Sequence, residues 1–109
     1  MHSRTSTLRI VSLLTEAGRE IRLFGNLDAL TCADFEVLAE HELTGDECVS
    51  LRIDANGVTT IDREGVRAIY AVLCEAQRQG VTHAVVEARG RVRRVLEQGL
   101  ERAGASPPS

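Results

Sequence analysis

The stretch "VTTIDREGVRAIYAVL", Val58 to Leu73, decides the fold, because it joins a predicted strand directly to a predicted helix. From Val66 onward the apolar residues recur every three or four positions, which is the spacing of one buried helix face. The predicted helix is "EGVRAIYAVLCEAQRQG", and Gly80 ends it. Its buried stripe is predicted to consist of Val66, Ile69, Tyr70, Leu73 and Ala76.

The junction between strand and helix holds three charges and a glycine, Asp62-Arg63-Glu64-Gly65. One interpretation is a helix cap, in which Asp62 accepts backbone N–H bonds and Gly65 allows close packing. The other is a recognition surface, because a helix amino end presents free N–H groups and about half a positive charge. Glu64 suits that end, whereas Arg63 opposes it slightly. The junction by itself leaves both interpretations open.

The rest of the chain divides into strand and helix patterns. Residues 8–14 and 20–25 are rich in branched apolar residues and flank a gap with a glycine, which predicts an antiparallel hairpin. The other predicted elements are strands at 48–54 and 82–88 and helices at 30–45 and 91–102. In the helix at 30–45 we expect Thr31 as the N-cap and Gly45 as the stop.

The predicted order is β-β-α-β-α-β-α, which is an α/β fold. Its two strand–helix–strand units should cross over right-handed and place their strands parallel, and the hairpin makes the sheet mixed. In the strand at 48–54, Val49, Leu51 and Ile53 alternate with polar residues, whereas a strand buried on both faces reads as continuously apolar. We therefore expect a mixed sheet with helices packed on one face and solvent or a partner on the other.

Composition sets the size of the domain and excludes some partners. The chain has 109 residues, 43% of them hydrophobic and none of them tryptophan, which suits one domain over residues 1–102 with a disordered tail at 103–109. The formal net charge of -3 predicts no direct attraction to nucleic acid or anionic membrane. No apolar run approaches the ~20 residues of a membrane span, and the first residues lack the apolar core of a signal peptide. We expect a cytoplasmic protein.

Metal, nucleophile and cofactor patterns are missing from the sequence. The histidines His2, His41 and His83 are scattered without ligand spacing, and "EARGRV" is not a dinucleotide-binding glycine loop. No Ser-His-Asp arrangement is supported. The three cysteines form no C-x-x-C pair, so we expect reduced thiols, with a redox disulfide as the alternative. They are Cys32, Cys48 and Cys74. We expect no metal, no cofactor and a binding module rather than an enzyme.

Two other segments have both a structural and a functional interpretation. "GNLD", residues 25–28, is a strand-exit turn, or it places Asn26 and Asp28 on a rim beside the junction. A basic cluster could hold a phosphate-bearing ligand, but helical spacing spreads it around the axis and Glu97 follows Arg93 by four residues. No aromatic residue lies within it to stack on bases, so a solvated face is the favoured interpretation. The cluster consists of Arg89, Arg91, Arg93 and Arg94.

Taken together, "IRLFGNLDALTCADF" and "LRIDANGVTTIDREGVRAI" resemble the STAS domain of anti-sigma factor antagonists. That family shows a "GELD" turn after its second strand and a "D-x-x-G-V-x-x-I-D-S-S-G" motif that leads into a helix. The matching residues here are Gly25, Leu27 and Asp28 in the first motif and Asp54, Gly57, Val58, Ile61, Asp62 and Gly65 in the second. The resemblance runs from about Arg19 to Leu100. After Leu100 the family usually adds a strand and a helix, and one packing layer is expected to be absent or supplied by a partner.

The resemblance implies a partner and a contact surface. Such antagonists bind an anti-sigma factor, often a GHKL-type serine kinase, and so free a sigma factor. The implied partner-binding residues are Asp62, Arg63, Glu64 and Gly65, with Asn26 and Asp28 beside them. A small-ligand sensor and a homodimer are open alternatives.

The phosphorylation switch of the family is expected to be absent here. Arg63 stands in place of the phosphoacceptor serine and Glu64 in place of the next serine, and the two are expected to form a nearly neutral pair. Thr59 and Thr60 are the alternative phosphoacceptors. Some STAS domains that lack the serine are accessory subunits of membrane transport ATPases of the ABC type, which is the second function that the resemblance implies.

Overall fold

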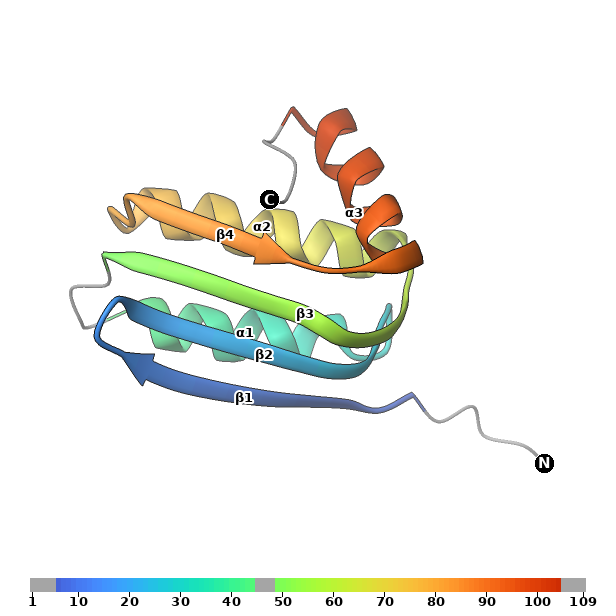
Figure 1. Ribbon diagram of the computed structural model, residues 1–109, viewed down its shortest axis with the longest axis horizontal. Helices are drawn as coiled ribbons and strands as arrows, with labels where there is room; N and C mark the ends of the chain where they lie inside the picture. Colours follow the sequence, from blue (N-terminus) through green and yellow to red (C-terminus); the bar gives the residue numbers. More distant parts are fainter. Residues whose placement is uncertain (1–5, 45–48, 105–109) are drawn as a thin grey trace.

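The computed structural model describes residues 6–44 and 49–104, which form seven elements. In chain order these are β1 (Leu8–Thr15), β2 (Gly18–Leu27), α1 (Cys32–Leu43), β3 (Ser50–Ile61), α2 (Arg63–Arg78), β4 (His83–Glu87) and α3 (Gly90–Arg102). The strands form one sheet in the order β1-β2-β3-β4, antiparallel between β1 and β2 and parallel elsewhere (Figure 1). The predicted element order and the mixed sheet are confirmed.

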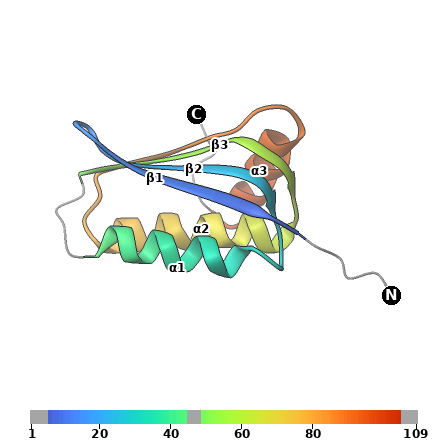
Figure 2. The same ribbon diagram turned by 90° about the horizontal axis from the view of Figure 1, so that it is seen from below.

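The molecule has two layers. Helices α1 and α2 lie side by side under one face of the sheet, and α3 packs beside the amino-terminal part of α2 (Figure 2). The core between the layers is aliphatic apart from one phenylalanine. Its largest fully buried side chains are Phe35, Ile21, Leu23, Leu27, Leu43, Leu51, Ile53, Ile69, Leu96 and Leu100. Packing of the helices on one face of the sheet is therefore confirmed.

Helix α2 buries the stripe that its spacing predicts. Val66, Ile69 and Ala76 are buried, and Tyr70 and Leu73 lie at the partly exposed edge of the stripe. Burial of a side chain such as Ile69 contributes about 1.5–3 kcal/mol relative to exposure. The helix is thus held on the sheet by its apolar face, and its amino end is placed wherever β3 ends.

Strand β3 is longer than the strand predicted at 48–54. It continues to Ile61. Register shifts in its pairing with β2, between Arg22 and Phe24 and between Gly25 and Asn26, break the simple alternation by which the sequence would show this extension, but they do not end the strand. A Cβ added at Gly57 would lie 2.4 Å from Phe24 Cδ1, so glycine permits this close pairing. The extension carries the start of α2 to the far end of β2.

Three smaller expectations have different outcomes. Leu51 and Ile53 are buried on one face as the alternation predicts, whereas Val49, which precedes β3, is 59% exposed and does not share that face. The helix stop predicted at Gly45 lies outside the described residues, and α1 ends at Leu43. The predicted tail at 103–109 is described only for Ala103 and Gly104, which follow the last turn of α3.

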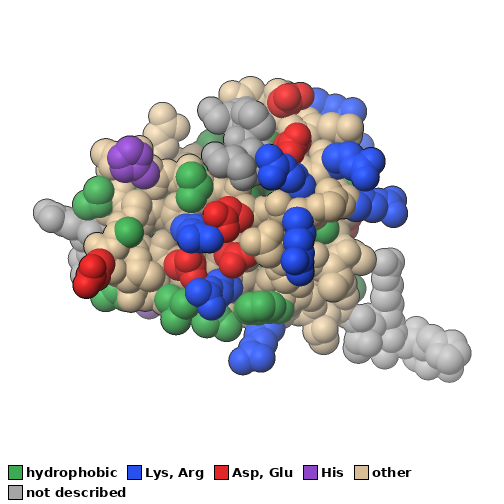
Figure 3. All heavy atoms as spheres, viewed as in Figure 1, with side chains coloured by type: hydrophobic (Ala, Val, Ile, Leu, Met, Phe, Trp, Pro, Cys, Tyr) green, Lys and Arg blue, Asp and Glu red, His purple; other side chains and the backbone are tan. Residues whose placement is uncertain are grey.

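The sheet face opposite the helices is open and carries an ionic cluster (Figure 3). Glu20 is only 8% exposed and contacts two arginines, Arg22 through Nε at 2.5 Å and Arg52 through Nε at 3.5 Å. Arg52 also pairs with Glu87 of β4, and this carboxylate is the main cause that raises the pKa of Arg52. The exposed apolar side chains Phe24 and Val85 lie on the same strands.

Candidate functional site

Asp62 caps α2 and ties it to the loop between β2 and α1. Its Oδ1 accepts a hydrogen bond from the Gly65 N–H at 3.0 Å, and its Oδ2 accepts one from the Ala29 N–H at 3.2 Å. Its own N–H donates to the Leu27 carbonyl at 3.3 Å. The helix-cap interpretation is confirmed, and the same carboxylate joins two loops that are far apart in sequence. Asp62 itself is exposed.

Gly65 lies beneath this junction. It is buried, and an added Cβ would lie 2.2 Å from the Leu27 carbonyl oxygen and 2.9 Å from Ile61 Cγ1. Glycine therefore lets the first turn of α2 approach the end of β2. Gly65 thus supports the surface from below, and its predicted contact with a partner stays a prediction.

Arg63 and Glu64 do not pair with one another. Glu64 Oε2 instead accepts from Arg67 NH2 at 2.7 Å, one turn further along α2. Arg63 is exposed and has no acidic partner among the residues that the structure describes. The charges of Arg63 and Glu64 still sum to nearly zero, but the i,i+3 spacing pairs Glu64 with Arg67 and not with its neighbour. Arg63 thus adds an unpaired positive charge to the already positive end of a helix.

Asn26 joins the ends of β2 and β3. Its Oδ1 accepts from Thr60 Oγ1 at 2.7 Å and lies 3.1 Å from Thr59 Oγ1. The Thr59 hydroxyl is also 3.1 Å from the Gly25 carbonyl oxygen. Both threonines are exposed, so the two alternative phosphoacceptors flank Asn26 at the rim.

Asp28 builds the turn that leads into α1. Its carboxylate accepts from Ser6 Oγ at 2.5 Å and from the Leu30 N–H at 2.9 Å. The Ser6 hydroxyl is the main cause that lowers the pKa of Asp28, and burial opposes it. Thr31 is buried beside it and turns its hydroxyl back to the Asn26 carbonyl at 2.7 Å. Thr31 is the N-cap residue of α1, as predicted, but its side chain makes no cap hydrogen bond, since that oxygen is used within the turn.

These residues form one surface, which we call the α2 rim: Asp62, Arg63, Glu64, Asn26, Asp28, Thr59 and Thr60. The parallel pairing of β2 and β3 brings it together, because both strands end on the same side of the sheet. The rim interpretation of "GNLD" and its turn interpretation both hold, since Asn26 and Asp28 make turn contacts next to Asp62. Sequence reasoning missed Ser6 and the Ala29 N–H, whose partners lie 22 and 33 residues away.

The basic cluster predicted from the sequence is mostly solvated, as expected. Arg93 pairs with Glu97 at 2.6 Å, whereas Arg89, Arg91 and Arg94 are exposed. Arg91 lines a cavity of about 260 Å³ that also reaches the rim. The other residues lining this cavity are Thr59, Thr60, Ile61, Val92 and Val95.

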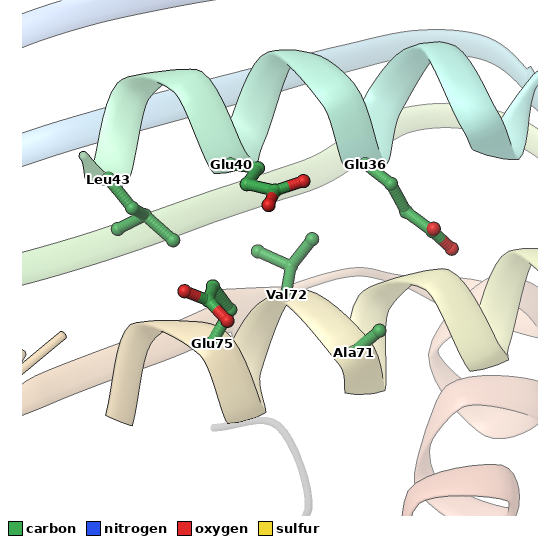
Figure 4. Close-up of a pocket in the computed structure, with 6 residues that line it drawn as sticks. All are labelled: Glu36, Glu40, Leu43, Ala71, Val72 and Glu75. Atoms are coloured by element: carbon green, nitrogen blue, oxygen red, sulfur yellow. The ribbon is translucent and has the colours of Figure 1, made fainter. Parts of the chain in front are cut away.

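A smaller hollow of about 160 Å³ lies between α1 and α2. Figure 4 shows carboxylates from both helices bordering an apolar floor. Its lining residues are Glu36, Glu40, Leu43, Ala71, Val72 and Glu75. Within residues 6–44 and 49–104, no group of three or more His, Cys, Asp or Glu residues has the arrangement of a metal site.

Two of the three cysteines are described, and both are free thiols, Cys32 and Cys74. Burial first, and then the carboxylates of Glu36 and Glu64, raise the pKa of the Cys32 thiol. A raised pKa lowers the thiolate fraction and with it the reactivity. Cys48 lies outside the described residues, as does His2.

A family model described as "Mlab, STAS domain" matches residues 12–102. The chain belongs to the STAS domain family. The match confirms the resemblance inferred from the two motifs and covers most of the chain. A comparison with curated proteins finds no significant match. No helix in the described part of the chain has the length and hydrophobicity needed to cross a bilayer.

Several solved structures have a similar fold. An anti-sigma factor antagonist from Mycobacterium paratuberculosis has a TM-score of 0.76 at 19% identity, covering 97% of this chain and 91% of that chain. RsbS from Moorella thermoacetica has a TM-score of 0.72 at 20% identity, covering 90% and 84%. The phosphorylated form of the Bacillus cell fate determinant SpoIIAA has a TM-score of 0.68 at 14% identity, covering 94% and 91%. At these identities the likeness shows that this STAS domain shares their fold.

Proposed function

We propose that this STAS domain is a non-enzymatic regulatory binding module of the anti-sigma factor antagonist type. It acts in the cytoplasm and docks an anti-sigma factor or a related GHKL-type serine kinase. The observation that carries the proposal is the α2 rim, an exposed helix amino end that Asp62 holds against the β2–α1 loop. Direct binding to nucleic acid or membrane has no part in it.

The contact residues follow from the rim. Asp62, Arg63 and Glu64 form its centre, with Asn26 and Asp28 beside them and Gly65 supporting it from below. A partner that covers this surface must neutralise Arg63, because a buried unpaired charge is strongly unfavourable. Apolar contact and shape give most of the affinity, whereas the charges select the partner and speed its association.

Regulation by phosphate at the usual position has no acceptor in this chain. Arg63 carries no hydroxyl, and Glu64 likewise replaces the second serine of the family motif. Thr59 and Thr60 are the alternative acceptors, and a phosphate on Thr60 would replace the proton that Asn26 accepts. We therefore propose a rim that is not phosphorylated at the family position.

The test is affinity purification from a lysate of the source organism, followed by mass spectrometry. The full-length wild type is compared with Arg63→Asp and with Arg94→Asp, which makes the same charge change at an exposed site on α3. We expect one kinase-like ATPase with the wild type and with Arg94→Asp, and its loss with Arg63→Asp. Recovery of no such ATPase by the wild type would contradict the proposal.

The alternative function is an accessory subunit of an ABC-type membrane transport ATPase. The observation that favours it is the replacement of both serines by Arg63 and Glu64, since STAS domains of that kind also lack the phosphoacceptor. The same purification, repeated on detergent-solubilised membranes, separates the two functions. Recovery of a membrane-bound transport ATPase in place of a soluble kinase-like protein decides for the alternative. Sedimentation of the purified chain tests the homodimer that the sequence leaves open.

A further inference from the structure

We propose that a groove between α2 and α3 receives an acidic segment of the docking partner, with apolar side chains between its carboxylates. This inference rests on the proposed function, because it names the chemistry of the same partner. The groove, called here the α2–α3 groove, has a volume of about 570 Å³. Among its lining residues, the buried Val66 and the half-buried Tyr70 and Val95 form what we call its floor. The exposed Arg63, Arg67 and Arg102 form its margins.

Close packing of the two helices shapes the groove. A Cβ added at Gly99 of α3 would lie 2.4 Å from Val66 Cγ1 of α2, so glycine permits the contact between the helices. On α3, Val95, Gly99 and Arg102 follow each other at helical intervals, and they line the groove as one stripe. An apolar floor between charged margins is the form of a site for an amphipathic segment.

The charge of the groove is local and positive. Arg63 and Arg102 have no acidic partner within the described ranges, and Arg67 is compensated by Glu64 at 2.7 Å. The whole chain is nonetheless acidic, with a formal net charge of -3. Unpaired arginines beside an apolar floor favour carboxylates, because the guanidinium fork binds a carboxylate through two hydrogen bonds and is only weakly hydrated.

The groove is continuous with the α2 rim. Arg63 belongs to both surfaces, and Val95 lines both the groove and the neighbouring cavity at Thr59 and Thr60. A partner that touches Asp62 and Arg63 therefore has a direct path along α2 toward Arg102. We infer that Asp or Glu residues of the partner meet Arg63 and Arg102 while Leu, Ile or Phe side chains contact the floor.

The first experiment places a photo-crosslinking benzoylphenylalanine at Gln98, which lines the groove, in the full-length chain. The matched control carries it at Gln77, an exposed position near the other end of α2. After irradiation in the lysate, mass spectrometry identifies the crosslinked peptide. We expect an acidic, apolar-containing segment of the ATPase from position 98 and no such peptide from position 77. A basic or neutral segment, a second copy of this chain, or a lipid adduct would overturn the inference.

The second experiment reverses one charge of the groove. Arg102→Glu is expected to weaken binding of the captured ATPase by about tenfold, equivalent to about 1.4 kcal/mol. The milder Arg102→Gln should weaken it less, and Arg94→Glu should leave it unchanged. Far-UV circular dichroism checks that each variant is folded. If Arg63→Asp loses the ATPase while Arg102→Glu and Arg102→Gln retain it, the proposed function stands and the groove inference is wrong.

If the wild type captures no ATPase, binding of a defined peptide probe tests the groove inference. The probe is a fluorescein-labelled helical peptide with leucine at three- and four-residue intervals between glutamates, compared with its lysine counterpart and with phosphatidylglycerol vesicles. The inference holds if the glutamate peptide binds, if Arg102→Glu weakens it and if Arg94→Glu does not. Absence of binding, or binding of the vesicles or the lysine peptide instead, overturns it.

Discussion

Substitution of Gly65 by alanine tests how the α2 rim is built. The added Cβ would lie 2.2 Å from the Leu27 carbonyl oxygen, where ordinary contact begins at 3.4 Å. The obstructing atom belongs to the backbone of β2, so it cannot turn aside as a side chain does. The first turn of α2 must move away by roughly 1 Å, and the Gly65 N–H bond to Asp62 moves with it.

Two opposing effects set the size of the loss. Overpacking of this kind costs about 1–3 kcal/mol, and a backbone obstruction belongs at the upper end of that range. Replacing glycine by alanine in a helix contributes up to about 1 kcal/mol in the opposite direction. The expected net loss of unfolding free energy is therefore about 2 kcal/mol. For a domain of this size that corresponds to a fall in Tm of about 8 °C.

Thermal and urea unfolding, followed by far-UV circular dichroism, measure this loss. The comparison variant is Gly99→Ala, whose added Cβ would lie 2.4 Å from Val66 Cγ1, a side-chain methyl group that can shift. We expect Gly99→Ala to lose less than about 1 kcal/mol, because the helix-propensity gain offsets a softer obstruction. The reasoning is refuted if Gly65→Ala is as stable as the wild type, or no less stable than Gly99→Ala.

Three further predictions concern the rim. Asp62→Ala removes both the cap and the bond to the Ala29 N–H, and should lower the unfolding free energy measured by urea titration by about 1–2 kcal/mol. Asp62→Asn should lose less, because its side-chain oxygen retains part of this hydrogen bonding. Equal stability of Asp62→Ala and the wild type would contradict the prediction. Because the pKa of Asp28 is lower in the folded chain than its ordinary value of 3.8, its stabilisation is complete above that pH and is lost as the pH falls through the folded pKa. Acid titration should therefore lower the unfolding free energy of the wild type more than that of Asp28→Asn. Removing the Ser6 hydroxyl with Ser6→Ala should make this difference in acid destabilisation smaller. Parallel acid curves for the wild type and Asp28→Asn would contradict the prediction. Arg63→Ser restores a hydroxyl at the family position, so the captured kinase and ATP should phosphorylate this variant and not the wild type, as read by intact mass; phosphate on the wild type at Thr59 or Thr60 would show that the alternative acceptors are used.

Local sequence patterns were sufficient where one segment determines the structure. The spacing of Val66, Ile69 and Ala76 predicts the buried face of α2, and Asp62 before that helix predicts the cap that the structure shows. The motif match also predicted the family. The end of β3 was misjudged because register shifts against β2 break its alternation, and these shifts depend on a strand that lies about thirty residues earlier.

Pairings across the rim could not be read from the sequence. Thr31 is a residue type that commonly caps helices with its side chain. Its hydroxyl instead donates to the Asn26 carbonyl and accepts from the Asp28 N–H, because the turn folds back on itself. Glu64 has one arginine directly before it, Arg63, and another three residues after it, Arg67. Helical geometry brings Glu64 to Arg67 and not to Arg63. Side chains choose among partners by distance in space, and a linear pattern does not contain those distances.

The sequence by itself determined the order of strands and helices, the aliphatic core and the STAS family of this protein, because periodic burial and short motifs are local properties of the chain. The tertiary structure alone decided that Glu64 pairs with Arg67 and not with Arg63, that Asp62 bonds to Ala29 and that Arg63 and Arg102 border one groove. Those features arise where β2 and β3 end together and where Gly99 brings α3 onto α2, and both are contacts between residues distant in sequence.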